Sequence, residues 1–428
     1  DVFLRLLTAV FTTRPVGFFE NASEANEKLG SLSYRMSKSE DFVGILTKIV
    51  PNLSKILLES DRVLSAANTI CSNVIGPTLK SKSFPDSISK SVLELLGQIV
   101  RISQIQKAWK KDLGDAFNDP RFFACPVALV ISDWLPILKQ WLLIEKERMP
   151  ETLSRLVPPA TAGIVFGVGA TSLRHEADRK AQLNLRRIAT LILAMMEDSF
   201  VKELPLIQEK IVELLSATAT SSPSSATRAE VFILLRAIVL KFSTVHLASL
   251  WPIINVELQA AISSVLSPVQ SSASDLYNNY SVIQACKLLD TLLCIAPDDF
   301  QLHEWLFITD TIDAIYRPPD LENFGLIDKL SEELELSANL GSISTNLAAI
   351  NDINSQVRRP LLGTSGIPVM EDWESRDELV GRVLRPFFSQ LSIFVFESTY
   401  SMNVPDRDVC ERGLLEDIFD DKNFVKGF

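Results

Sequence analysis

Apolar residues recur at helical spacing along most of this chain. One stripe consists of Leu95, Ile99, Ile102, Ile105 and Trp109. Steps of three or four positions place such residues on one side of a helix. The runs 247–265 and 282–293 repeat the spacing, and no stretch alternates apolar and polar residues as a half-buried strand does. The pattern therefore predicts an all-α protein.

Breaks in this pattern indicate how the helices are organised. Apolar segments of about 15–25 residues recur between polar breaks, which is typical of antiparallel helix pairs. No strict repeat period is present, so we expect an elongated α-solenoid of degenerate HEAT/armadillo-like pairs. It should cover residues 1–336, with a polar loop at 216–227. A Ser/Asn/Gly-rich linker at 337–370 and C-terminal helices at 371–428 should follow.

Composition restricts the class of protein. The 428 residues exceed the roughly 250–300 that one core can organise, which also favours a stack of helices. A net charge of -11 opposes nucleic-acid binding. Five scattered cysteines without a CxxC pair indicate reduced, buried thiols in a cytosolic protein. Mean hydropathy is +0.18, so much apolar surface must be buried. Because residue 1 is Asp, we expect a fragment of a longer protein.

Membrane insertion is not expected from the sequence. The longest uncharged stretch, 156–173, contains Pro158, Pro159 and three glycines, which favours a loop over a spanning helix. We find no signal peptide.

Residues that could carry chemistry are scarce. None of the three histidines has a metal-ligand partner at a suitable spacing. The glycines of GVGATS follow no predicted strand, so they do not indicate a phosphate-binding loop. The sequence therefore predicts no catalytic residue, no metal and no cofactor. An enzyme with an unrecognised site remains an alternative, which a pocket lined by convergent polar groups would favour.

One amphipathic helix carries a basic strip. Arg179 and Arg186 are seven residues apart, as are Lys180 and Arg187, so all four should lie on about a third of the helix circumference. This strip is either a solvated face with Glu176 bridging its lysine, or a dock for acidic headgroups or an acidic partner.

A second basic segment reads KAWKK. Trp109 belongs to the apolar stripe, whereas Lys107, Lys110 and Lys111 point elsewhere. The lysines are either solvated or a further contact for an anionic surface.

A segment near the C-terminus is apolar on two sides. Its main face consists of Leu384, Phe387, Phe388, Leu391, Phe394 and Val395, and Ile393 and Phe396 fall outside that face. Pro386 suits a first turn, so the helix should begin near Leu384. Either the acidic helix around LLEDIFDD folds back over the second side, or a homodimer covers it. The self-association residues would be Phe387, Phe388, Leu391, Ile393, Phe394 and Phe396.

Several blocks resemble the C-terminal region of the Dopey family. They include AWKKDLGDAFNDPRFF, LRHEADRKAQLNLRRIATLI, LPLIQEKIVELL and YSVIQACKLLDTLLCIAPDDFQLHEWLFI. They occur in the family's order and spacing, with the best match over 85–310.

This resemblance implies a cytoplasmic scaffold held peripherally on Golgi and endosomal membranes. The implied partners are a large scaffold related to Sec7-type Arf exchange factors, an aminophospholipid flippase, a phosphoinositide-bearing membrane and a second copy of the chain. The alternative in the same class is another helical transport or tethering adaptor that does not bind lipid directly.

Overall fold

Helices make up nearly all of the regular structure that can be described. The computed structural model describes residues 42–102, 105–157, 169–215, 223–266, 276–309, 325–336, 357–363, 367, 375–400 and 403–419. Its contacts divide the chain into two compact units. Unit 1 contains the described residues up to Arg148 together with Phe419, and unit 2 contains Met149–Ile418. Each unit is described by itself.

Unit 1 is a set of short helices. In chain order they are a helix over 42–49, η1 (Val50–Asn52), α3 (Leu53–Ile56), α4 (Ser60–Ile70), η2 (Cys71–Ile75), α5 (Gly76–Leu79), α6 (Lys90–Val100), α7 (Gln106–Asn118), η4 (Pro120–Ala124), α8 (Val127–Leu129), η5 (Val130–Trp134) and α9 (Leu135–Ile144).

Aromatic rings fill the core of unit 1. Phe122 packs edge-on against Trp134 with ring centroids 5.0 Å apart, and Phe117 does the same with Trp141 at 5.8 Å. Phe419 lies 5.5 Å from Phe122. Edge-to-face pairs of this kind stabilise a core beyond the area they bury.

The apolar stripe of residues 95–109 comes from two helices. α6 ends at Val100 and α7 begins at Gln106, so the prediction of one continuous stripe is wrong. Leu95, Ile99 and Trp109 are nevertheless fully buried. Because α6 and α7 pack against each other, their apolar faces meet one core and preserve the spacing across the break.

Unit 2 contains the longer helices. They are α10 (Arg148–Ser154), α11 (Gly169–Ala194), α12 (Leu204–Leu215), α13 (Ser225–Lys241), η6 (Thr244–His246), α14 (Trp251–Ser263), η7 (Ser264–Leu266), α16 (Asn279–Ile295), α17 (Asp298–Gln301), η8 (Glu304–Leu306), α19 (Leu326–Leu336), α20 (Arg376–Leu379), η9 (Val380–Leu384), α21 (Arg385–Tyr400) and α22 (Arg407–Ile418).

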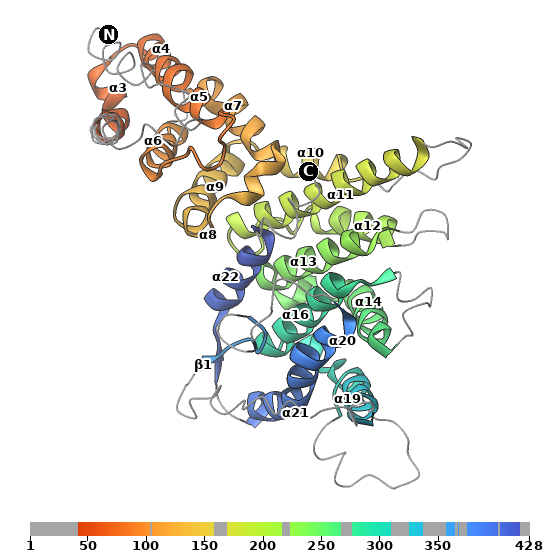
Figure 1. Cartoon of the computed structure of the whole chain (residues 1–428). Coiled ribbons are helices and arrows are strands. Elements are labelled where there is room, and N and C mark those ends of the chain that lie inside the picture. The colour runs from red at the N-terminus through yellow and green to blue at the C-terminus, as the bar shows by residue number, and fades with distance from the viewer. Residues whose placement is uncertain are drawn as a thin grey trace, which may run out of the picture. The chain divides into compact units, whose positions relative to one another are not determined.

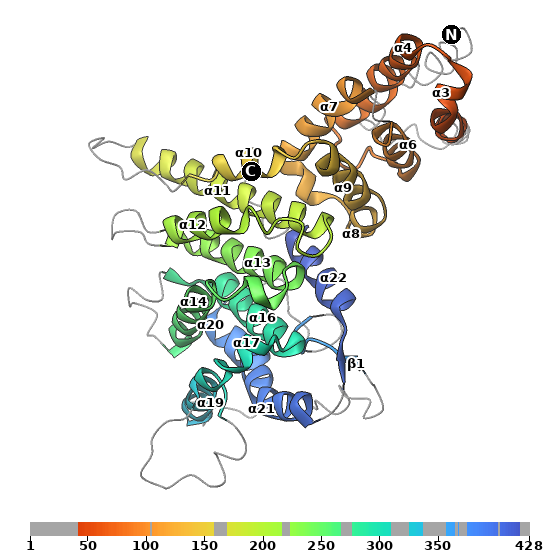
Figure 2. The same ribbon diagram turned by 180° about the vertical axis from the view of Figure 1, so that it is seen from behind.

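These helices stack in chain order. α11 packs on α13, α13 on α16, and α14 on α16, as successive rows in Figures 1 and 2. α19 packs on α21, and α22 returns from the C-terminus to lie against α13 and α11. Trp251, which lies in the apolar run 247–265 of the sequence, is 3% exposed. The prediction of an all-α solenoid-like fold is confirmed.

Strand pairing in the described residues is minor. β1 (Val357–Arg358) and β2 (Val404–Pro405) form a parallel pair of two residues each, with Val357 opposite Val404. All five cysteines are free and buried, as the sequence indicated.

Three prolines follow π-helical turns. η2, η5 and η9 each precede a helix whose second residue is proline, namely Pro77, Pro136 and Pro386. The residue before each proline donates its N–H to the carbonyl five residues back. Since proline lacks an N–H, the widened turn lets the helix continue past it. The expected start near Leu384 is therefore wrong, because the helix begins at Arg376.

The polar loop expected at 216–227 is also shorter than predicted at its C-terminal end. The Ser224 side chain accepts a hydrogen bond from Thr227 N and α13 begins at Ser225. Serine at a helix N-cap accounts for this start. Most of the expected linker at 337–370 lies outside the described residues.

Candidate functional site

The basic strip predicted on α11 does not face solvent as a whole. Arg186 is fully buried and Arg187 is 7% exposed. Arg179 is half-buried and Lys180 is exposed, bonded to Glu176 at 2.6 Å. The prediction of one outward strip is therefore wrong for Arg186 and Arg187. Residues of α13 and α22 bond Arg186, and Arg187 bonds Asn184 of its own helix.

Arg186 instead joins four helices. Its Nε donates to both carboxylate oxygens of Glu230 on α13 at 2.9 Å. Its Nη1 donates to the carbonyl of Ile418 at 2.7 Å, and its Nη2 to the Tyr280 hydroxyl at 3.1 Å. Burial raises the pKa of Glu230, and the adjacent guanidinium opposes that rise. An arginine bonded on all sides in this way fixes its neighbours.

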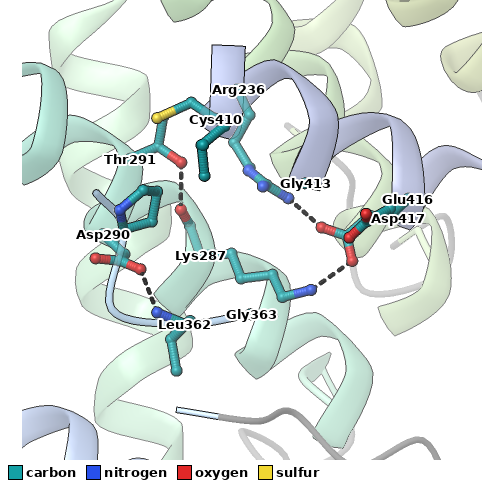
Figure 3. Close-up of a pocket in the computed structure, with 12 residues that line it drawn as sticks. Arg236, Lys287, Asp290, Thr291, Leu362, Gly363, Cys410, Gly413, Glu416 and Asp417 are labelled. Atoms are coloured by element: carbon teal, nitrogen blue, oxygen red, sulfur yellow. Dashed lines mark hydrogen bonds and ion pairs between the residues drawn. The ribbon is translucent and has the colours of Figure 1, made fainter. Parts of the chain in front are cut away.

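A small cavity lies elsewhere in unit 2. Its volume is about 60 Å³, and its lining comes from α13, α16, α22 and the segment 357–363. Asp417 of α22 bonds Arg236 of α13 and Lys287 of α16, each at 2.5 Å (Figure 3). Although burial acts to raise it, the pKa of Asp417 lies below its ordinary value because Lys287 and Arg236 stabilise the carboxylate.

Asp290 holds the other wall of the cavity. It is 1% exposed, and its two oxygens accept from the backbone N–H groups of Leu361 and Leu362 at 2.9 and 2.7 Å. Figure 3 shows the bond to Leu362. Burial raises its pKa to about 7, against these two hydrogen bonds. Asp290 thus fastens the segment 357–363 to α16.

The residues that line the cavity suit a structural role better than ligand binding. A volume of about 60 Å³ is far below the roughly 300–1,000 Å³ that pockets for small-molecule ligands occupy. Its lysine, arginine and aspartates are already bonded to one another or to backbone. The cluster therefore serves as a clamp that fixes α22 and the segment 357–363 onto α13 and α16.

Two cysteines lie at the edge of this clamp. Cys294 Sγ and Cys410 Sγ are 3.8 Å apart and both are buried. The hydrogen bond to Cys410, together with burial, raises the pKa of Cys294 above its ordinary value. Such thiols are poor nucleophiles. Among the described residues no group of three His, Cys, Asp or Glu side chains could hold a metal ion.

Sequence reasoning did not identify the buried acidic residues Glu230 and Asp290. Glu230 stands in AEVFILL and Asp290 in KLLDTLL, where each charge interrupts an apolar run. Charged residues are almost never fully buried unless paired. A lone charge inside such a run was thus the signal that could have found them.

The lysines of KAWKK lie on α7, in unit 1. Lys107, Lys110 and Lys111 are exposed, while Trp109 is fully buried between them. Lys110 is paired with Glu145, which also accepts a hydrogen bond from Trp141 Nε1. Lys107 and Lys111 keep their charges toward solvent.

Comparison with known proteins identifies the family. A sequence model of the family described as DOP1 C-terminal matches residues 1–401. "Protein dop1" of Emericella nidulans is 48% identical over 99% of this chain. The chain belongs to the DOP1 C-terminal family. It is also 23% identical to "Protein DOP1" of Saccharomyces cerevisiae over 84% of the chain, and 27% to "Protein DOP1B" of Xenopus laevis over 67%.

The matched region is one part of the DOP1 relatives. The alignments cover 23%, 20% and 13% of the lengths of the Emericella, Saccharomyces and Xenopus proteins. No solved structure matches the chain.

The apolar segment predicted to self-associate forms most of α21 in this DOP1 region. Phe387, Phe388, Leu391 and Phe394 are buried in unit 2, whereas Ile393 is 60% and Phe396 47% exposed. The position of the last two outside the main face is confirmed. Burial excludes the other four from any surface contact. Of the two alternatives for this side, cover by the acidic C-terminal helix is wrong, because α22 lies on α13 and both residues are exposed.

Two helices of the described part have the length and hydropathy of a membrane span. They are Val127–Ile144 and Arg376–Ser398, with 39% and 50% of their most apolar windows buried inside the protein. Core helices of soluble proteins share these properties. The stretch considered from the sequence, 156–173, lies mostly outside the described residues.

Proposed function

We propose that this chain is a non-catalytic scaffold in membrane traffic between the Golgi and endosomes. One observation carries the proposal: the buried charges of unit 2 bond helix to helix, through Arg186 and Glu230 and through Asp417 and Arg236. Buried charges that are paired in this way hold the helices rigidly together. Partners would then bind to the surface of the stack. Membership of the DOP1 family supports the same role.

We propose two partners for a full-length protein that resembles the DOP1 relatives. They are a large scaffold related to Sec7-type Arf exchange factors and an aminophospholipid flippase. The protein would be cytoplasmic and held peripherally on Golgi and endosomal membranes. A stack of helices provides the extended surface that such assembly requires.

Contact with an anionic, phosphoinositide-bearing membrane is a finer part of the proposal. Lys107 and Lys111 on α7 are its best-placed residues, because both are exposed. Lys180 and Arg179 on α11 are weaker, since Lys180 is bonded to Glu176. Each basic residue near an anionic surface contributes about 1 kcal/mol.

A helical adaptor without direct lipid binding is the second candidate. The burial of Arg186 and Arg187 favours it, because two of the four charges expected to contact lipid are inside the protein.

Self-association is a further part of the proposal, through Ile393 and Phe396 on α21. A two-fold contact would use this patch on both copies. The exposed apolar area of the two side chains supports it.

A relocation experiment tests the scaffold function. The full-length protein would be fused to a mitochondrial outer-membrane anchor, and the positions of the Sec7-related scaffold and the flippase followed by microscopy. We expect at least one to move to mitochondria, and to stay in place when the anchored protein lacks this region. If neither moves, the scaffold function is wrong.

A further inference from the structure

The three turns of unit 2 that follow α11, α13 and α16 expose large apolar side chains. The turns 195–203, 242–250 and 296–306 follow the C-terminal ends of α11, α13 and α16. They expose Met196, Val245, Leu302 and Trp305 by 63, 76, 72 and 67%. We name this set of turns the turn edge.

Hydrogen bonds hold the first two turns of the turn edge together. Asp198 N donates to the carbonyl of Lys241 at 2.9 Å, and Asp198 Oδ1 accepts from Ser243 N at 2.8 Å. The hydrogen bond from Ser243 N lowers the pKa of Asp198. The two turns therefore lie side by side.

The third turn is joined to the second through Trp251. Its ring lies 5.8 Å from Phe300, and its Nε1 donates to Asp299 Oδ2 at 3.5 Å. Figure 2 shows α17 next to the end of α16 and below the connection from α13 to α14. The exposed side chains thus belong to one continuous edge of the stack.

Trp305 is a preformed aromatic anchor on this edge. Its indole Nε1 donates to the carbonyl of Leu302 at 3.0 Å, so its polar atom already has a partner. The ring remains in solvent together with the side chain of Leu302. Rigid tryptophans of this kind are typical hot spots of protein interfaces.

The charges around these side chains select the partner. The three turns contain six carboxylates, including Asp298 and Glu304, and one lysine, Lys202. One of the six, Glu197, lies 3.8 Å from Arg407 of α22. An excess of carboxylates repels an anionic membrane and attracts a cationic segment. The apolar side chains require that the segment also has an apolar face.

We propose that the turn edge binds a basic amphipathic helix of a partner protein. Trp305 and Leu302 contact the apolar face of that helix, and the carboxylates pair with its lysines and arginines. This rests on the proposed scaffold function and gives it a partner chemistry. Helix docking on an apolar surface is an established recognition mode.

A peptide titration on the complete chain tests the proposal. The probe is a fluorescein-labelled amphipathic peptide with leucine on one face and lysine on the other, followed by fluorescence anisotropy. Since a protein of net charge -11 attracts any cation, the decisive variants leave charge unchanged. Leu302→Ser with Trp305→Ser should weaken binding about tenfold or more, as hot-spot losses do. Val256→Ser, another exposed apolar site of unit 2, should leave binding unchanged.

Three outcomes would overturn the proposal. They are equal binding by the double variant and wild type, equal binding of a peptide with glutamate in place of lysine, and binding of phosphatidylserine vesicles that the double variant abolishes. The last result would assign the turn edge to a membrane. Relocation of partners by the full-length protein would then still support the scaffold function, so the two proposals fail separately.

Discussion

Arg186 of α11 and Glu230 of α13 form an ion pair that is 0 and 2% exposed, with Nη2 2.8 Å from Oε1. Removing one partner of such a pair leaves an uncompensated buried charge, which costs about 3–5 kcal/mol. We expect Arg186→Met to lower the free energy of unfolding in urea by about that amount. Arg186→Met with Glu230→Leu should recover much of the loss, because neither charge remains.

Lys180→Met is the matched control for this pair. Lys180 bonds Glu176 on the surface of the same helix, and such pairs contribute about 0–1 kcal/mol. A double variant as unstable as Arg186→Met alone would contradict the role given to the buried pair.

Truncation of Trp251 should destabilise the fold, whereas truncation of Trp305 should leave its stability almost unchanged. Trp251 is 3% exposed, so Trp251→Ala should cost about 3–5 kcal/mol. Trp305 is 67% exposed, so Trp305→Ala should change stability by no more than about 0.5 kcal/mol. Thermal unfolding followed by circular dichroism measures both. Equal melting temperatures for the two variants would show that Trp251 is not a core residue.

Asp290 should make stability depend on pH. Its pKa is about 7 in the folded chain, whereas the ordinary value of 3.8 applies to the unfolded chain. Between these two pH values the folded chain therefore keeps a proton that the unfolded chain releases. The contribution is fully present below 3.8 and is lost as pH rises through about 7. In this pH window the free energy of unfolding of wild type should fall by up to about 1.4 kcal/mol per pH unit. We expect Asp290→Asn to abolish this fall.

Urea titrations at several pH values between about 4.5 and 7 measure this slope. Exposed Asp298→Asn is the control and should keep the wild-type slope. An unchanged slope in Asp290→Asn would place the titrating group elsewhere.

Self-association through α21 can be tested by light scattering. If Ile393 and Phe396 form a two-fold contact, wild type should be dimeric at tens of micromolar, roughly the range of weak interfaces. Phe396→Asp should yield a folded monomer, and Val245→Asp, at another exposed apolar site, should remain dimeric. A monomeric wild type at these concentrations rules out the contact.

Vesicle flotation tests the lysines of α7. Lys107→Glu with Lys111→Glu should release the chain from phosphoinositide vesicles, since both charges face solvent. Lys202→Glu, an equally exposed lysine of unit 2, should float as wild type does. Undiminished flotation of the double variant would remove α7 from the proposed membrane contact.

Helical class and core were accessible from the sequence because apolar spacing records burial directly. Trp109, Trp251 and Leu289 were found on apolar stripes and are buried. Helix boundaries were less accessible at prolines. Pro386 was interpreted as a first-turn residue, yet the π-helical turn η9 extends the helix back to Arg376. The residues next to a proline do not indicate whether a π-helical turn precedes it.

The prediction of an exposed basic face on α11 was wrong for a different reason. Helical spacing gives the direction of a side chain but not what packs against it. Arg186 points away from the apolar stripe, and α13 and α22, distant in sequence, cover it. Glu230 and Tyr280 supply the polar partners, and no spacing rule connects them to Arg186.

Localisation of the full-length protein in living cells tests the scaffold function most directly. In cells lacking their own copy, tagged wild type and Val256→Ser should coincide with Golgi and endosomal markers. The variant with Leu302→Ser and Trp305→Ser should fold equally well and lose its partners at the turn edge. Wild-type protein that stays diffuse in the cytoplasm, with Golgi and endosomal markers undisturbed by its absence, would contradict the function proposed for this chain.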